Sequence, residues 1–446
     1  MRTPLLASLI AIALAACQPS ATPTEAATAR DAANNANAAA PAPSAVYTLE
    51  PWSLPTPANA AQPELVTAPD GSLLLAWIAA AADDHALQFA RYTDGEWGAA
   101  RTIAHGDDWF VNWADTPHIV ATADGALWAH WLQKSAAATY AYDVALVRSD
   151  DDGATWSEPR LVNDDGTPTE HGFVAMWPAS ADSLGIAWLD GRATAGAGHG
   201  GHDAHGGGMM TLRGARFDAE FGRSGETVID ASTCDCCQTD AALTARGPLL
   251  VYRDRTAEEI RDIAVTRFDG DRWTDPERVH ADGWKMPACP VNGPTIDARD
   301  SEVLVGWYTA AGDIPTVKIA RSRDAGDNFA VPLTIDTGPA VQGRIDVVLG
   351  ADSAWVLWTR EDDAGQSLQL ARYTPDLSRE LQRIEVARLH GRGRGTGFAQ
   401  LALADGAAHI AWTDVVDGKP SLHGAVLRPA AGDAMTSTAA ASLAID

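Results

Sequence analysis

The chain has 446 residues, and its 59 acidic side chains against 33 lysines and arginines give a formal net charge of -26. Nucleic acids and anionic membrane surfaces carry charge of the same sign, so the composition argues against both as partners. The 39 glycines and 16 tryptophans, without a long apolar stretch of helical period, favour an all-β domain built from repeats.

The N-terminus has the pattern of an export signal. Residues 1–17 start with a basic Arg2 and continue with a short apolar run that ends in small residues before Cys17. The last four of them, LAAC, resemble the bacterial lipobox, which implies cleavage and lipidation at Cys17; an ordinary secretory signal is the alternative. In lipoproteins of this kind Gln18 implies sorting to the outer membrane. We therefore expect an exported, lipid-anchored protein that faces the periplasm or the cell surface.

Composition divides the rest of the chain into three parts. Residues 18–44 are mostly Ala, Pro, Thr and Asn, cannot bury enough apolar surface to fold, and are expected to form a disordered tether. We expect the folded domain to span residues 45–430 and residues 431–446 to form a disordered tail.

Seven similar repeats fill the expected domain. Each contains an apolar strand that ends in an aromatic residue, and these strand ends lie 51 to 64 residues apart. They are Trp77, Trp131, Trp188, Tyr252, Trp307, Trp358 and Trp412. Each is preceded by a turn and another short strand, and most are followed by two more strands, so that four antiparallel strands recur as in propeller blades. The pattern predicts a seven-bladed β-propeller, with a six-bladed sialidase-type ring as the alternative.

The seventh repeat lacks a fourth strand. Residues 46–52, ahead of the first repeat, are expected to supply it by pairing with the strand at 422–427, which would close the ring. Tyr252 stands where the other six repeats have Trp, so we expect it in the core rather than in a catalytic role.

Two repeats contain a turn motif between their third and fourth strands. The stretches SDDDGATW, from Ser149, and SRDAGDNF, from Ser322, match the Asp-box, in which Asp binds turn amides and Gly permits a left-handed turn. With these motifs the chain resembles the sialidase (BNR-repeat) superfamily. It is also similar to bacterial sialidase-like proteins in the stretches NWAD, EHGF, CDCCQT, YRDR, EIRD and CPVNGP. The resemblance implies an exo-sialidase-like glycoside hydrolase.

Propeller topology gathers charged residues on one rim. Loops between second and third strands and the crossings between blades fall on this rim, whereas the Asp-boxes fall on the other. The predicted site residues there are Glu170, His171, Asp190, Arg192, Arg253, Asp254, Arg255, Glu259, Arg261, Asp262 and Arg344. Arginines could bind an acidic sugar and crowded carboxylates could do acid–base work. The alternative is that these charges form ion pairs that hold loops together.

Cysteines and histidines mark two loops. Cys234, Cys236, Cys237 and Cys289 lie at the starts of adjacent repeats, where they could form two disulfides, one of them to Cys289, or bind zinc or cuprous copper as thiolates. A glycine-rich insertion carries three histidines, which are candidate ligands for a transition metal unless the loop is simply solvated. These are His199, His202 and His205.

Two hypotheses follow from these features. The first is a monomeric, sialidase-like lipoprotein that requires no cofactor and hydrolyses or binds an acidic glycan, or another small polar ligand, at the arginine-rich axial face. The second is a non-enzymatic binding or metal-handling lipoprotein that uses the propeller as a platform.

Overall fold

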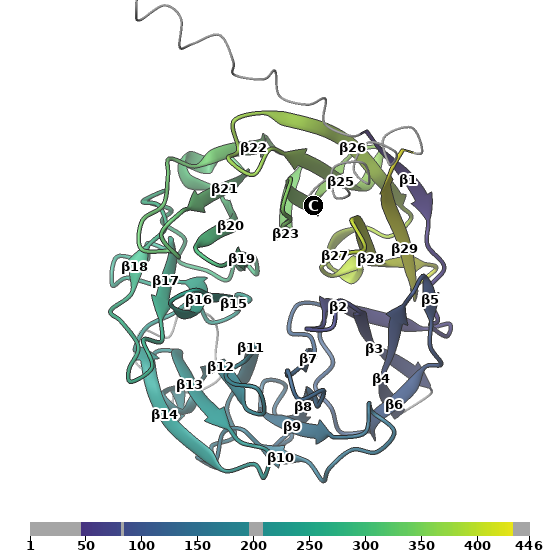
Figure 1. Ribbon diagram of the computed structural model, residues 1–446. Coiled ribbons are helices and arrows are strands. Elements are labelled where there is room, and N and C mark those ends of the chain that lie inside the picture. The colour runs from purple at the N-terminus through teal and green to yellow at the C-terminus, as the bar shows by residue number, and fades with distance from the viewer. Residues whose placement is uncertain (1–45, 82–83, 196–207, 431–446) are drawn as a thin grey trace, which may run out of the picture. The chain divides into compact units, whose positions relative to one another are not determined.

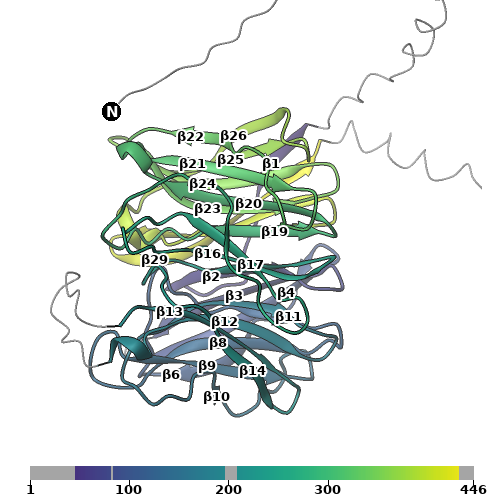
Figure 2. The same cartoon turned by 90° about the vertical axis from the view of Figure 1, so that its left-hand side faces the viewer.

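The computed structural model describes residues 46–81, 84–195 and 208–430. Seven antiparallel sheets stand around a central axis, so the all-β, seven-bladed propeller is confirmed and the six-bladed alternative is wrong (Figure 1). In side view most strands run from one side of the ring to the other, so that each strand ends near one of its two rims (Figure 2). Among the described residues, no helix is both long enough and apolar enough to cross a membrane.

Each of the seven repeats forms one blade, with its first strand nearest the axis. Blades 1 and 2 contain β2 (Ala60–Thr67), β3 (Leu73–Ala81), β4 (Asp84–Thr93), β5 (Glu96–Trp97), β6 (Arg101–Gly106), β7 (Ile119–Ala121), β8 (Leu127–Lys134), β9 (Tyr142–Ser149) and β10 (Arg160–Leu161). Blades 3 and 4 contain β11 (His171–Pro178), β12 (Leu184–Asp190), β13 (Thr211–Phe217), β14 (Arg223–Asp230), β15 (Asp240–Thr244), β16 (Gly247–Arg253), β17 (Ile263–Arg267) and β18 (Glu277–Arg278). Blades 5 and 6 contain β19 (Thr295–Arg299), β20 (Glu302–Thr309), β21 (Thr316–Ser322), β22 (Leu333–Thr337), β23 (Val341–Leu349), β24 (Ala354–Asp362), β25 (Gly365–Tyr373) and β26 (Glu380–Leu389).

Blade 7 joins the two ends of the domain. It contains β27 (Gln400–Ala404), β28 (Ala407–Val416), β29 (Lys419–Pro429) and, as its outer strand, β1 (Tyr47–Pro51). Leu49 faces Leu427 and Pro51 faces Ala425 in this pair. The predicted closure by the N-terminal strand is therefore confirmed.

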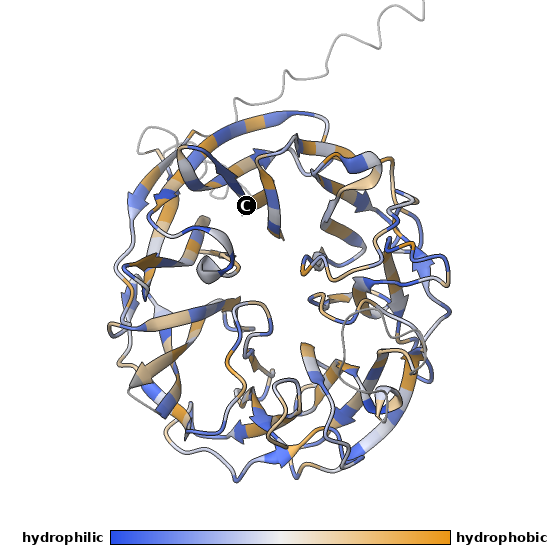
Figure 3. Ribbon diagram, turned by 180° about the vertical axis from the view of Figure 1, so that it is seen from behind, coloured by the Kyte–Doolittle hydropathy of each residue, from blue (hydrophilic) through white to orange (hydrophobic). Residues whose placement is uncertain are grey.

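The core lies between neighbouring blades. Second strands are apolar on both sides because both faces of each sheet are covered, and the repeated aromatic residues pack there. Trp77, for example, is fully buried against the inner strands of blade 7. Tyr252 is also fully buried and belongs to the core between blades 3 and 4, as the repeat pattern predicted. The outermost strands alternate polar and apolar residues, as Figure 3 shows along the edge of the ring.

Strand direction separates two rims. The crossing rim is defined by the loops between second and third strands and by the crossings from one blade to the next. The Asp-box rim is opposite and contains the turn between β9 and β10, where Asp151 accepts hydrogen bonds from the Thr155 amide at 2.8 Å and from the Ser149 hydroxyl at 2.8 Å. These bonds lower the pKa of Asp151 to about 2. Gly153 in this turn packs against Phe89 of blade 1, so the Asp-box fastens its turn to the previous blade.

Candidate functional site

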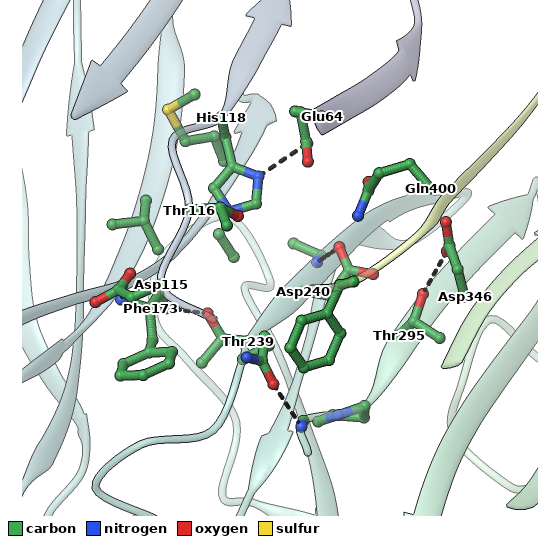
Figure 4. A pocket seen from close by; sticks show the side chains of 18 of the residues that line it. Glu64, Asp115, Thr116, His118, Phe173, Thr239, Asp240, Thr295, Asp346 and Gln400 are labelled. Carbon is green, nitrogen blue, oxygen red and sulfur yellow. Dashed lines mark hydrogen bonds and ion pairs between the residues drawn. The ribbon is translucent and has the colours of Figure 1, made fainter. Parts of the chain in front are cut away.

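A polar cavity of about 210 Å³ lies at the axis, lined by the inner strands of all seven blades and the crossings that lead into them. Its polar lining residues are Glu64, Asp115, Thr116, His118, Gln238, Thr239, Asp240, Thr295, Asp346 and Gln400 (Figure 4). Four of these are carboxylic acids and His118 is the one cationic candidate among them. The cavity therefore offers hydrogen-bond acceptors to a ligand rather than a positive pocket.

Irregular backbone gives the inner strands their shape at the cavity. Three of them carry a β-bulge at the same place in the blade, beside Glu64, Ala175 and Asp346. Phe173 and Arg344 have positive φ values of 49° in these bulges, a conformation that costs energy for residues with a side chain. Bulges turn side chains away from the regular alternation of a strand, and they concentrate near functional sites.

Carboxylates on the inner strands bind the next blade. Asp240 accepts the amide of Ile296 at 2.8 Å, and Asp346 accepts the amide of Leu401 at 2.7 Å. Burial nevertheless raises the pKa of Asp240 to about 6 and that of Asp346 well above its ordinary value. Asp240 and Asp346 therefore bind protons more readily than exposed carboxylates do. Through its hydrogen bond to a backbone amide, each of them also connects its blade to the next one.

His118 partly balances the acids. Its Nδ1 lies 2.8 Å from Oε1 of Glu64 (Figure 4). Burial alone would lower the pKa of His118, but the neighbouring charges of Glu64, Asp240 and Asp115 raise it. The cavity lining therefore contains one side chain that becomes positively charged on protonation, among several carboxyl groups.

A tyrosine joins the cavity to the crossing rim. The Tyr142 hydroxyl lies 3.1 Å from Oδ2 of Asp115 and 2.8 Å from Oε1 of Glu170, and its ring stacks on Phe110. Burial raises the pKa of Asp115 to about 7 and that of Glu170 to about 8. A tyrosine hydroxyl has one proton and can donate it to only one acceptor at a time. A proton on one of the two carboxyl groups therefore completes the second hydrogen bond at neutral pH.

Most of the predicted site residues of blade 3 form a separate charged network. His171 is fully buried, and its Nε2 lies 3.1 Å from Asp165 and 3.8 Å from Asp190. These three side chains could converge on a metal ion, but the Arg192 guanidinium already binds Asp190 at 2.7 Å and lies 3.4 Å from Asp165. Both carboxylates therefore already have a cationic partner within this network.

Two predicted arginines bind the backbone. Arg253 donates to the carbonyls of Asn292, Arg261 and Tyr308 at 2.6 to 3.0 Å. Arg344 donates to the carbonyls of Gly393 and Gly397 and to the Thr396 hydroxyl. Both are almost completely buried, which lowers the pKa of Arg253 to about 9 and that of Arg344 to about 10. These two side chains hold the crossings between blades in place. Their contacts favour a structural role over direct ligand binding.

The remaining predicted residues of blade 4 form a compact ion-pair cluster. Arg255 binds Glu259 at 2.7 Å and Asp235 at 3.1 Å, and Arg261 binds Glu259 at 2.9 Å. Nε and Nη1 of Arg261 are buried without a hydrogen-bond partner among the described residues. Asp262 accepts the amides of Gly283 and Trp284.

Asp254 lies next to Arg255 of this cluster. Its carboxylate accepts the amide of Arg255 at 2.7 Å, and burial raises its pKa above the ordinary value.

The four cysteines form two disulfides, Cys234–Cys237 and Cys236–Cys289, so the predicted pair of disulfides and the predicted link to Cys289 are confirmed. His199, His202 and His205, like Cys17, lie outside the described residues.

Three residues of the candidate site are not among the predicted site residues. Asp115 ends the NWAD stretch, in a crossing that the repeat pattern places on the crossing rim, and Tyr142 opens the third strand of blade 2 without any motif. Arg394, in the short 3₁₀ turn Gly393–Thr396, is exposed and lies over the Trp113 ring with its guanidinium carbon 5.6 Å from the ring centre. A polar residue in the crossing into every blade would have been the signal to follow.

Solved structures that match this chain at low similarity include proteins named as a polysaccharide lyase, a sialidase and an arabinanase. Polysaccharide lyase Uly1 has 8% identity, with 80% of this chain and 87% of that chain covered and a TM-score of 0.47. Trypanosoma rangeli sialidase in complex with sialic acid has 12% identity, with coverages of 77% and 57% and a TM-score of 0.45. Penicillium chrysogenum alpha-L-arabinanase complexed with arabinobiose has 12% identity, with coverages of 75% and 99% and a TM-score of 0.42. At such identities the likeness concerns the fold alone.

A search among curated proteins found no matching sequence. A family model described as a BNR repeat-like domain matches residues 71–344, which is more than half of the chain and includes both Asp-boxes. The resemblance read from the Asp-boxes is thereby confirmed, and the chain belongs to the BNR repeat-like domain family.

Proposed function

We propose that the protein binds a glycan at the axial cavity and that Asp115, Tyr142 and Glu170 exchange a proton with it. The observation that carries this proposal is the single tyrosine hydroxyl shared by two carboxyl groups. A carboxyl group that keeps its proton near pH 7 can act as a general acid, and glycoside cleavage uses such a group beside a second carboxylate.

The cavity suits the hydroxyl groups of a sugar. Asp240, Asp346 and Glu64 supply acceptor oxygens, while Gln238 and Gln400 supply amides. Tyr142 is fully buried, so its part is to position and relay the proton between the carboxyl groups rather than to attack the sugar.

An acidic group of the glycan would have to stay outside this carboxylate-rich cavity. Arg394 supports such a placement because it is exposed on the crossing rim, and its guanidinium has a ring contact with Trp113 but no ion pair among the described residues. Burial is the main cause that lowers the pKa of Arg344; the charge of Glu361 opposes it and the charge of Arg394 adds to it, so Arg394 lies near Arg344 on this side of the molecule. We therefore place the acidic substituent of the sugar at Arg394.

Binding to immobilised acidic and neutral glycans tests this assignment. Arg394→Ala should weaken binding of the acidic glycan by about 10- to 100-fold, since a charged hydrogen bond contributes about 1.5 to 3 kcal/mol, and should leave a neutral glycan unaffected. The matched control is Arg272→Ala, which removes an exposed arginine from the loop between β17 and β18 on the Asp-box rim. Equal losses in both variants, or no glycan binding by the unchanged protein, would contradict the proposal.

Export and lipid anchoring are a second part of the proposal. Residues 1–17 and Cys17 support export and lipid anchoring, with the propeller held near the outer membrane. Membrane fractionation of the Cys17→Ser variant tests this: the variant should be released into the soluble fraction, and continued membrane association would contradict lipidation at Cys17.

A further inference from the structure

Four sulfur atoms lie together where the crossings into blades 4 and 5 meet. The Sγ atoms of Cys234, Cys236 and Cys237 all lie within 4.8 Å of one another, and Cys289 is bonded to Cys236. In a tetrahedral zinc–thiolate site the Zn–S distance of about 2.3 Å places neighbouring sulfurs about 3.8 Å apart. Three of the sulfurs therefore lie close enough together to share one metal ion, and Cys289, which is bonded to Cys236, is the nearest candidate for a fourth ligand.

We infer that these four cysteines, once both disulfides are reduced, bind one thiophilic d¹⁰ metal ion, Zn²⁺ or Cu⁺, through four thiolates. This site is separate from the proposed glycan site and does not depend on it.

Backbone contacts hold the cysteine loop independently of the disulfides. The amide of Cys234 donates to the carbonyl of Arg253 at 3.0 Å. Gln238, directly after the loop, donates to the carbonyl of Ala114 at 2.8 Å and accepts the amide of Gly293 at 2.8 Å. Because these bonds reach blades 2, 4 and 5, the segment from Cys234 to Gln238 should keep its place when the disulfides are reduced.

Two arginines lie beside the carboxylate of the cysteine loop. Asp235, between Cys234 and Cys236, binds Arg255 at 3.1 Å and lies 3.9 Å from Arg261. The Nε and Nη1 groups of Arg261 are buried and have no hydrogen-bond partner among the described residues. These two arginines offset the negative charge of Asp235, which would otherwise raise the cost of forming thiolates beside it.

The burial of the sulfurs differs between the two pairs. Cys234 and Cys237 are each 1% exposed, whereas Cys236 and Cys289 are partly exposed. A reductant can therefore reach the Cys236–Cys289 bond first, and a thiolate formed there is near enough to the second disulfide for exchange.

The redox step balances with a dithiol as reductant. Each disulfide takes up two electrons and two protons and becomes two thiols, so two dithiol molecules reduce both bonds and each becomes a cyclic disulfide. The metal ion then displaces protons from the thiols as the four metal–sulfur bonds form.

Metal titration of the full chain tests the inference. The chain is reduced with dithiothreitol, desalted without oxygen, and titrated with Zn²⁺ against a chromogenic chelator, and separately with Cu⁺ against a cuprous chelator. We expect one ion per reduced chain and none at comparable affinity in the oxidised chain, while near-UV circular dichroism stays that of the folded protein. The two titrations together decide which ion the site prefers.

Variants separate the thiolates from other ligands. Cys234→Ser with Cys237→Ser keeps the Cys236–Cys289 pair and should weaken metal binding to the reduced chain by more than about a hundredfold, since even changes to outer-shell partners cost about 10- to 100-fold. Any uptake by the histidine-rich loop should be the same in oxidised and reduced chains and in this variant.

Three outcomes would overturn the inference. They are equal uptake by oxidised and reduced chains, unchanged uptake by the double variant, and loss of the fold on reduction, since the inference requires the loop to be held by its backbone contacts.

Discussion

Tyr142 has one hydroxyl proton and two carboxyl neighbours, and this inequality sets the chemistry of the candidate site. Asp115 and Glu170 cannot both be charged beside it without leaving one acceptor unmatched in a buried place. Burial and mutual repulsion therefore keep a proton at this site in the folded chain, whereas both carboxyl groups ionise near pH 4 when the chain unfolds.

The pH dependence of stability should report this retained proton. The folded pKa of Glu170 is raised from 4.5 to about 8, so its contribution to stability is fully present below about pH 4 and is lost as the pH rises towards 8. In Glu170→Gln this loss should be reduced, by up to about 1.4 kcal/mol per pH unit for one proton. Urea denaturation of both proteins between pH 4 and pH 8 measures the difference, and parallel curves would contradict the assignment.

Arg253 should behave as a structural residue. Its guanidinium binds three backbone carbonyls, and Arg253→Ala would leave these buried acceptors unpaired and a gap beside Trp284. We expect the free energy of unfolding to fall by about 3 kcal/mol or more, measured by urea denaturation. Arg394→Ala is the matched control and should change stability by less than about 0.5 kcal/mol. A fully stable Arg253→Ala protein with impaired ligand binding would instead restore Arg253 to the binding site.

Residue type alone could not distinguish these cases. The sequence places Arg253, Arg255, Arg261 and Arg344 at the crossing rim, where the structure has the end of β16, the loop after it and the start of β23. It does not say whether a guanidinium meets a carbonyl, a carboxylate or a ligand. Tyr142 was missed for the same reason, because Asp115 and Glu170 lie 27 and 28 residues away in the chain and meet it only across two blades.

At the scale of the strands, carboxylates join neighbouring blades. Asp297 of β19 accepts the amide of Leu349 of β23 at 2.7 Å, and Asp115, Asp240 and Asp346 make the same contact from other blades. The inner strands of adjacent blades have few ladder bonds between them, so one side-chain bond supplies a partner for an amide at each of these junctions.

Substitution of Asp297 should weaken one junction without touching the cavity. Asp297→Ala leaves the Leu349 amide without its acceptor and should lower the free energy of unfolding by about 1 to 3 kcal/mol. Asp297→Asn keeps an acceptor oxygen and should lose less. Thermal or urea unfolding of the three proteins checks the order, and an unchanged Asp297→Ala protein would show that this bond is dispensable.

At the scale of the whole molecule, β1 and β29 close the ring. Besides the strand pairing, Trp52 donates its amide to the carbonyl of Gly424 at 2.9 Å and stacks on Trp97 of blade 1 with ring centres 4.8 Å apart. The closing segment therefore connects blade 7 to blade 1 by hydrogen bonds and by aromatic packing.

Removal of this segment should open the ring. A chain that starts at residue 53 would expose the edge of β29 and lose the Trp52 contacts, so we expect a lower melting temperature and aggregation. A chain that starts at residue 45 is the control and should melt like the full chain. Calorimetry and light scattering measure both effects, and equal melting of the two truncated chains would show that blade 7 does not need its outer strand.

The seven blades could be predicted because six of them are local in the sequence and the seventh takes only its outer strand from the other end of the domain. Strands, turns and the buried aromatic residues of one blade recur within 51 to 64 residues, so their period is visible without tertiary information. The axial cavity is lined by a few residues from each of the seven blades, and such a set has no period and no motif. The architecture was therefore predictable where the lining of the cavity was not.

The central claim is that the proton held between Asp115, which lines the axial cavity, and Glu170 takes part in glycan binding. It is tested most directly by the affinity of the full chain for its best acidic glycan at pH 6 and at pH 9, compared with the affinity of Glu170→Gln. The unchanged protein should bind more weakly at pH 9, because Glu170 loses its proton near pH 8, and the Gln variant, whose amide always donates, should lose much less. Equal affinity of the unchanged protein at the two pH values would contradict the account.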